Sequence, residues 1–152
     1  MPETIFDKIV RGEIESHIVW ESETHIAFLT PFPNTPGFTV VIPKINIGDN
    51  VFALNDEQYL DLMKATKIVA NILEKALGVK RVALVFEGTG VAHVHAKLIP
   101  LYGHLADETD VWGDQTEFVE EYRGFITTLE GPKMDDTRLD EIRDKIINAQ
   151  VN

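Results

Sequence analysis

The segment 92–100, with the sequence AHVHAKLIP, alternates between polar and apolar side chains with a period of two. Such alternation is typical of a β-strand that buries one face and displays the other. One face carries His93, His95 and Lys97, and the other carries Val94, Ala96 and Leu98. We therefore expect a strand from His93 to Ile99 that presents three cationic or protonatable side chains to a small anion.

Most of the other apolar runs also predict strands. They are short, rich in β-branched or aromatic residues and bounded by turn residues, and they cover residues 17–20, 24–29, 38–42, 82–86 and 122–129. One long helix interrupts this series of strands. The pattern favours an α+β fold, with an antiparallel sheet flanked by helices, over a wound parallel sheet.

Capping residues mark where helices begin. Asn55, with Gln58 three residues later, predicts the start of the long helix, and Gly78 predicts its end. A short helix over residues 4–10 is expected from Thr4 at the N-cap position. A terminal helix, carrying an apolar face through residues 139–146, is expected to begin at one of residues 135–137.

The composition favours one domain over residues 1–152 and excludes several kinds of chemistry. A chain of 152 residues with 44% hydrophobic side chains is long enough to bury a core. The absence of cysteine excludes disulfides, thiolate metal ligands and a cysteine nucleophile, and we expect a cytoplasmic protein. The net charge of -11 disfavours binding to nucleic-acid polymers or anionic membranes.

Histidine is the strongest candidate nucleophile, because no serine of this chain lies in a Gly-x-Ser-x-Gly turn. A neutral imidazole can attack phosphorus, and the phosphoramidate that forms is labile to hydrolysis. His95 is flanked on its own face by His93 and Lys97, which can orient it and balance phosphate charge. The turn Gly88-Thr89-Gly90 lies just upstream and lets backbone N–H groups approach a phosphate.

Two other interpretations of the His-x-His pair stay open from the residues alone. The two histidines can pack as structural residues, or they can chelate zinc. The ammonium of Lys97 on the same face argues against a divalent cation, and no third or fourth ligand follows at a recognisable spacing. We predict no metal site belonging to the protein itself.

These residues resemble the histidine-triad (HIT) superfamily, whose signature is His-x-His-x-His followed by apolar residues. Three more segments are similar to the family's in the family's order, namely residues 5–14, residues 26–29 with 33–37, and residues 40–44. The likeness covers about residues 4–102 and leaves a C-terminal extension, about residues 118–152, unaccounted for.

The resemblance implies a homodimer that holds a nucleoside phosphate beside the histidine segment. It makes His95 the nucleophile that attacks the phosphorus attached to the nucleoside. It makes His93 a structural residue whose backbone carbonyl fixes the tautomer of His95. Lys97 stands in place of the third histidine and would bind the phosphate, although a lysine with an ordinary pKa near 10.4 donates protons poorly.

The resemblance also implies nucleotide-binding positions. Ile5, Phe6 and Ile9 correspond to an apolar slot for the base. Three residues depart from the family pattern near the ribose and phosphate: Thr30 in place of an aspartate, Asn46 in place of a histidine, and Phe86 in place of a polar residue. Gly88, Thr89 and Gly90 form a loop that is shorter than the family's usual glycine-rich loop.

We therefore predict a hydrolase or nucleotidyltransferase acting on nucleoside phosphates or dinucleoside polyphosphates through a nucleotidyl-histidine. It requires no cofactor beyond a divalent cation carried with the nucleotide. The substituted positions motivate an alternative from another class, a non-catalytic or weakly active nucleotide-binding or interaction module. The expected partners are a nucleoside phosphate and a second copy of the chain, with no nucleic-acid polymer and no membrane.

Overall fold

The computed structural model describes residues 1–128 and 131–150. The chain divides into two compact units, Met1–Thr109 and Asp110–Asn152, and each is described by itself. No helix within the described ranges is long and apolar enough to cross a membrane.

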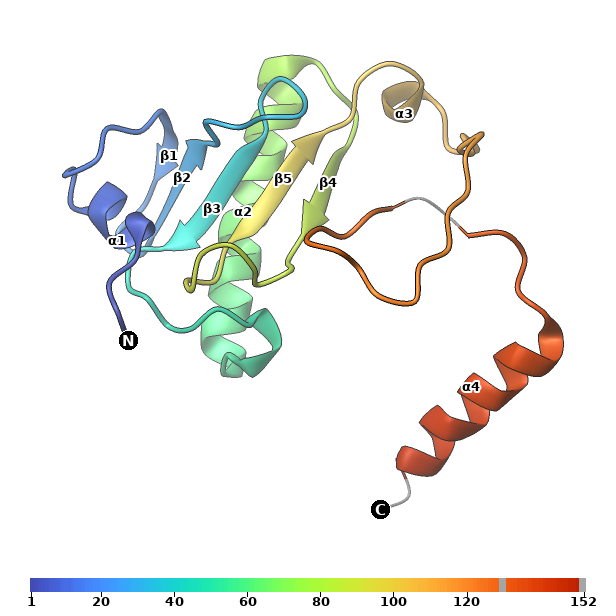
Figure 1. Ribbon diagram of the computed structural model, residues 1–152. Helices are drawn as coiled ribbons and strands as arrows, with labels where there is room; N and C mark the ends of the chain where they lie inside the picture. The colour runs from blue at the N-terminus through green and yellow to red at the C-terminus, as the bar shows by residue number, and fades with distance from the viewer. Residues whose placement is uncertain (129–130, 151–152) are drawn as a thin grey trace. The chain divides into compact units, whose positions relative to one another are not determined.

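The first unit is built on a five-stranded sheet in which every neighbouring pair of strands is antiparallel (Figure 1). The strands are β1 (Ile18–Glu21), β2 (His25–Leu29), β3 (Thr39–Pro43), β4 (Val82–Val85) and β5 (Ala96–Pro100). Their order across the sheet is β1-β2-β3-β5-β4. The sheet and its flanking helices confirm the predicted α+β class.

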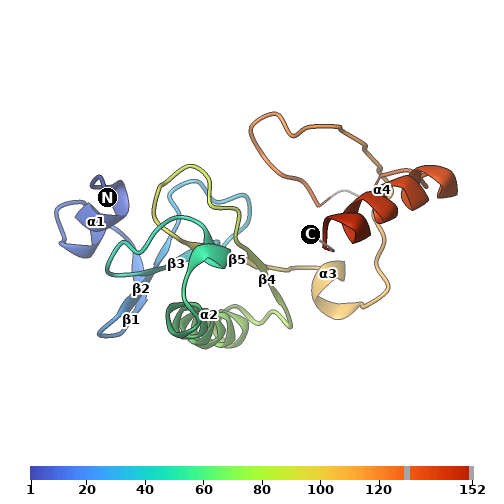
Figure 2. The same cartoon turned by 90° about the horizontal axis from the view of Figure 1, so that it is seen from below.

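The long helix α2 (Asp56–Leu77) covers one face of the sheet (Figure 2). Its start follows the prediction, because the side chains of Asn55 and Gln58 each accept a hydrogen bond from the other's backbone N–H. Its end follows too, since Gly78 takes the left-handed conformation with φ of 68°. The buried side of α2 packs on alternate residues of β2, β3 and β5.

The short helix α1 (Ile5–Val10) packs on the other face (Figure 2). Thr4 caps it as predicted, in a reciprocal capping box with Asp7. Phe6 and Ile9 are buried against the side chains of β2 and β3 that point away from α2: Ile26, Phe28, Val40 and Ile42. Because successive strand residues face opposite ways, the two helices use complementary halves of the same strands.

The predicted strand from His93 to Ile99 is wrong at its start, because β5 begins at Ala96. Pairing with β3 starts at the partners Val41 and Ala96. Before that point the N–H of Val94 donates to the carbonyl of Gly48 in a loop rather than to a strand. The alternation nevertheless persists, since His93 and His95 contact Phe6 on the α1 face while Val94 packs on the α2 face.

Two short helices of the first unit were not predicted, a 3-10 turn over Val51–Ala53 and α3 (His104–Asp107). Both are too short to produce the periodic apolar pattern from which helices are recognised in a sequence.

The second unit contains α4 (Asp136–Ala149), which confirms the predicted terminal helix. Asp135 caps it, with its side chain accepting a hydrogen bond from the N–H of Thr137 at 2.7 Å. The strand predicted over residues 122–129 is wrong for residues 122–128, which form no strand, and Leu129 lies outside the described residues. Gly124, with φ of 104°, breaks the extended backbone there.

Candidate functional site

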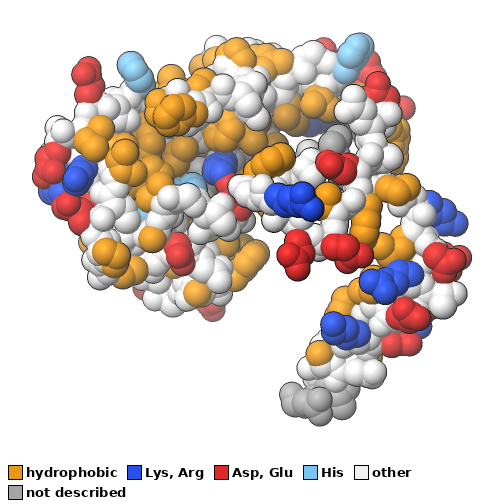
Figure 3. All heavy atoms as spheres, viewed as in Figure 1, with side chains coloured by type: hydrophobic (Ala, Val, Ile, Leu, Met, Phe, Trp, Pro, Cys, Tyr) orange, Lys and Arg blue, Asp and Glu red, His pale blue; other side chains and the backbone are white. Residues whose placement is uncertain are grey.

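A cavity of about 520 Å³ opens between α1, the β2–β3 connection and the first half of β5. Figure 3 shows this face. Histidine side chains (pale blue) and lysine or arginine side chains (dark blue) are visible there among hydrophobic side chains (orange). The structure brings together most of the predicted site residues here. Those lining the cavity are Ile5, Phe6, Ile9, Thr30, Thr89, Gly90, His95 and Lys97.

Sequence reasoning missed part of the lining. The missed residues are Phe28, Pro31, Phe32, Asn34, Phe38, Val40 and Val91. Most belong to the β2–β3 connection or to its flanking strand ends. The proline-rich composition of residues 31–37 indicates a connection, but only the tertiary structure brings residues of this connection and of α1 around the same cavity.

His95 is buried at the floor of the cavity, and its ring meets that of Phe6 edge-on at a centroid distance of 5.4 Å. Nδ1 of His95 lies 2.8 Å from the backbone carbonyl oxygen of His93. A carbonyl oxygen only accepts, so Nδ1 carries the proton and donates it. The lone pair of the neutral ring is therefore on Nε2, which gives His95 the tautomer of a nucleophile.

His93 does not line the cavity, and it is fully buried. Its Nε2 donates to the carbonyl oxygen of Pro43 at 2.8 Å, which fixes the ring and, through the backbone, the carbonyl that holds His95. Burial lowers the pKa of His93, while the Pro43 carbonyl and the Asp7 carboxylate act in the opposite direction. The ring is thus kept neutral, in a positioning role.

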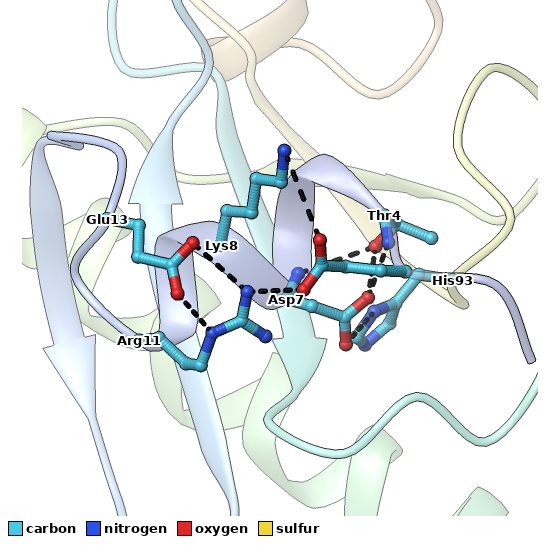
Figure 4. A network of polar contacts seen from close by, with 7 residues as sticks. Thr4, Asp7, Lys8, Arg11, Glu13 and His93 are labelled. Carbon is cyan, nitrogen blue, oxygen red and sulfur yellow. Dashed lines mark hydrogen bonds and ion pairs between the residues drawn. The ribbon is translucent and has the colours of Figure 1, made fainter.

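Asp7 connects α1 to this histidine (Figure 4). One carboxylate oxygen, Oδ2, accepts from the backbone N–H and the hydroxyl of Thr4, each at 2.7 Å. The other, Oδ1, lies 3.9 Å from Nδ1 of His93. The hydrogen bond from the Thr4 backbone is the main cause that lowers the pKa of Asp7. Asp7 therefore carries a charge that caps the helix and faces the histidine.

Lys97 lies on β5, where it pairs in register with Val40 and Val85. Its ammonium forms an ion pair with the carboxylate of Glu87, a residue that sequence reasoning did not select. Partial burial lowers the pKa of Lys97, and the Glu87 carboxylate favours the charged form. The ammonium group that Lys97 contributes to the cavity lining is therefore already paired with the Glu87 carboxylate.

Three predicted nucleotide-binding residues lie outside this cavity. Phe86 and Gly88 line a separate hollow beside residues 49–52. Asn46 holds the backbone that leads into the histidine segment. Its side chain donates to the carbonyl of Ala92 at 2.9 Å and accepts from the N–H of Gly48 at 3.1 Å.

The described residues hold no group of three or more histidine or carboxylate side chains that could bind a metal ion. His93 is fully buried and lies outside the cavity that His95 lines, so the two rings do not face a common cavity.

The family model for the HIT domain matches residues 11–104 of this chain. This range includes the sheet, α2 and the histidine segment. The chain belongs to the HIT domain family. Protein hit from Bacillus subtilis is 36% identical over 113 residues, which cover 71% of this chain and 77% of that protein. Adenylylsulfatase HINT1 from Arabidopsis thaliana is 29% identical over 102 residues, covering 63% of this chain and 69% of that protein.

The fold is also similar to a solved structure of a HIT family member from Bacillus subtilis. The TM-score is 0.64 at 27% sequence identity, and the match covers 97% of this chain and 96% of the other. The HIT domain supports nucleotide binding by this chain.

Proposed function

We propose that this HIT protein is a nucleotidyl hydrolase or transferase that acts on nucleoside phosphates or dinucleoside polyphosphates through a nucleotidyl-His95 intermediate. The observation that carries the proposal is the hydrogen bond from Nδ1 of His95 to the carbonyl of His93. It leaves the lone pair on Nε2, in a residue that lines a cavity of nucleotide size.

The cavity offers different chemistry to the two ends of a nucleotide. Its apolar part, with Ile5, Phe6 and Ile9 from α1, suits a base. Its polar part, with His95 and Lys97, suits a phosphoryl group. The backbone at Thr89 and Gly90 borders the same polar part, where N–H groups can approach phosphate oxygens.

In the first step the Nε2 lone pair of His95 attacks the phosphorus attached to the nucleoside 5′-oxygen. The N–P bond forms as the bond from phosphorus to the leaving group breaks, and the leaving group departs with the electron pair and takes a proton from solvent. The His93 carbonyl, accepting from Nδ1, stabilises the positive charge that develops on the ring.

In the second step a water molecule attacks the same phosphorus. The new O–P bond forms, the N–P electron pair returns to Nε2, and the proton of the water is released. An alcohol or phosphate acceptor in place of water gives transfer instead of hydrolysis. The similarity to adenylylsulfatase HINT1 from Arabidopsis supports an adenylyl group as the transferred unit.

Labelling tests the covalent step. The protein is incubated with nucleotide labelled at the α-phosphorus, quenched and assayed for acid-labile label on the chain. We expect label on the wild type and on His17→Ala, an exposed histidine outside the cavity, and none on His95→Ala. Wild-type protein that neither takes up label nor hydrolyses any nucleotide would contradict catalysis.

The second candidate function is nucleotide binding without efficient turnover. It is motivated by Lys97, which is held by Glu87 and is a poor proton donor for a leaving group. Thermal shift with a nucleotide panel separates the two functions, because a ligand stabilises the folded state whether or not it is turned over. Stabilisation without product release favours the binding module, whereas no response to any nucleotide contradicts both.

We further propose that two copies of the chain associate through β4. This strand ends the order of the described sheet, and an apolar groove of about 460 Å³ lies between it and α2. Leu60 and Leu84 are exposed along that groove. Two-fold pairing of β4 with its copy would cover the edge and both leucines. Sedimentation should give a dimer for the wild type and a monomer for Leu84→Lys; a monomeric wild type contradicts the pairing.

A further inference from the structure

We infer that a cavity on the α2 face of the sheet is a separate binding site, which takes a small organic ammonium ion. This cavity measures about 210 Å³ and lies among the ends of β2 and β3, the residues that follow β3, and the first turns of α2. It shares no lining residue with the cavity that His95 lines. Because pockets for drug-sized molecules measure roughly 300 to 1,000 Å³, we expect a ligand of few heavy atoms.

His25 is the buried histidine of this cavity, and the proposed mechanism leaves it unused. It lies on β2, opposite Pro43 of β3 in the register of the sheet. It comes two residues before Ala27, whose side chain belongs to the core beneath α2, so the two side chains share that face. His25 is only 6% exposed, yet it lines the cavity.

One ring nitrogen of His25 is available to a ligand. Nδ1 lies 2.8 Å from the hydroxyl oxygen of Thr24, whereas Nε2 has no hydrogen-bond partner among the described residues. Nε2 is not sealed off either, because the fully buried side-chain atom without a partner in the described ranges is Nδ1 of His93. Buried polar side chains are usually paired with protein, water or a ligand. An ammonium ligand pairs with the tautomer in which Nδ1 donates to Thr24 and Nε2 presents its lone pair.

The charges around the cavity favour a cation over an anion. The lining contains the carboxylates of Glu23 and Asp61 and the ammonium of Lys44. The ammonium is already paired with the carboxylate of Glu21, 2.7 Å away and outside the lining. A bound anion would therefore meet carboxylates without a free positive charge to offset them.

Asp61 is the carboxylate best placed to hold the ammonium group. Burial lowers the pKa of His25, and the charge of Asp61 acts in the opposite direction, as expected for a carboxylate close to the ring. Asp61 also pairs with Lys64 at 3.1 Å, but the lysine side chain is 72% exposed and such surface pairs are weak. A ligand cation can therefore take the place of Lys64.

The remaining walls suit a short hydrocarbon chain rather than a metal ion. Pro43, Ile45 and Ile47 give the lining an apolar side. The described residues contain no group of three histidine or carboxylate side chains that could hold a metal ion. An ammonium head on a short alkyl chain matches both the acidic and the apolar part of the cavity.

An NMR titration of the full-length protein at pH 8 tests the inference. The probes are n-butylammonium, 1-butanol and butyrate at equal ionic strength, which have similar hydrocarbon chains and differ in the charge of the head group. At this pH an alkylamine is protonated. We expect saturable shifts of the His25 ring signals with n-butylammonium, at a dissociation constant of about 1 mM, and binding about tenfold weaker or less for the other two probes.

Two variants with the same change of charge locate the site. Asp61→Asn should weaken binding of n-butylammonium about fivefold. Glu57→Gln, at an exposed residue of α2 outside the cavity, is the matched control and should leave that binding unchanged.

The inference is overturned if n-butylammonium gives no saturable shift at His25, if the three probes bind equally, or if the two variants weaken binding by the same factor. The comparison of probes on the wild type decides the question even where Asp61→Asn does not fold. Because no probe contains phosphate, none of these results bears on the nucleotide function.

Discussion

The Asp7 carboxylate lies 3.9 Å from Nδ1 of His93, with Oδ1 facing the imidazole and Oδ2 capping α1. Nδ1 of His93 is a buried nitrogen without a hydrogen-bond partner among the described residues. Protonation at this atom would gain Asp7 as a counter-ion but would place a charge in a fully buried position. The contact thus joins the helix that lines the cavity to the segment that orients His95.

We predict that the protein loses stability as the pH falls below about 6.5, the ordinary pKa of histidine. Burial lowers the pKa of His93 in the folded state, so in this range the unfolded chain binds more protons than the folded chain. His25 is also buried, and its lowered pKa acts in the same direction. Urea unfolding between pH 7.5 and 5 should show a slope of up to about 1.4 kcal/mol per pH unit for each such histidine.

His93→Gln should flatten that pH dependence, and the exposed His17→Gln should leave it as in the wild type. Imidazole titration by NMR checks the same point directly. A His93 resonance that titrates at or above pH 6.5 would show that Asp7 outweighs burial.

Asp7→Ala should lower the free energy of unfolding by about 1 kcal/mol, because it removes one half of the capping box. Asp61→Ala is the control: its exposed ion pair with Lys64 is expected to contribute less than about 0.5 kcal/mol. Denaturant titration measures both. Equal losses in the two variants would mean that the box contributes nothing beyond a surface charge.

Phe32→Ala should weaken nucleotide binding with little effect on stability. The side chain is 88% exposed, yet it lines the cavity, so its removal deletes ligand contact without opening the core. We expect a loss of affinity of about fivefold and a stability change within about 0.5 kcal/mol. Phe52→Ala, 85% exposed and outside this cavity, should change neither quantity; an identical affinity loss there would refute the assignment.

Lys97→Met should destabilise the fold by about 1 to 3 kcal/mol, since it leaves the mostly buried Glu87 carboxylate without its partner. Adding Glu87→Gln should recover most of that loss. A double-mutant cycle in urea measures the coupling. Lys64→Met, which breaks an exposed pair, should cost less than about 0.5 kcal/mol. Additive effects of Lys97→Met and Glu87→Gln would rule out a coupled pair.

The local features of the fold were predictable because they depend on residues close together in the chain. The two capping boxes, at Thr4 with Asp7 and at Asn55 with Gln58, are hydrogen bonds across three residues. That His95 and Lys97 lie on the same face was predictable, because side chains two residues apart in an extended backbone point the same way. This period holds at His95 even though β5 begins only at Ala96.

Pairings between distant segments were not predictable in the same way. The resemblance predicts nucleotide contacts for Asn46 and Phe86. In the structure both lie outside the cavity that His95 lines: Asn46 is hydrogen-bonded to the carbonyl of Ala92, and Phe86 packs beside the core. Glu87 was overlooked, because nothing in its own neighbourhood distinguishes an ion-paired carboxylate from a solvated one. Its meeting with Lys97 depends on β4 and β5 lying antiparallel.

The sequence by itself determined which residue types lie on each face of the histidine segment, because side-chain direction in extended chain is a local property. Only the tertiary structure decided how much free charge Lys97 offers. That charge depends on the carboxylate of Glu87, whose position is set when the sheet and its loops pack together.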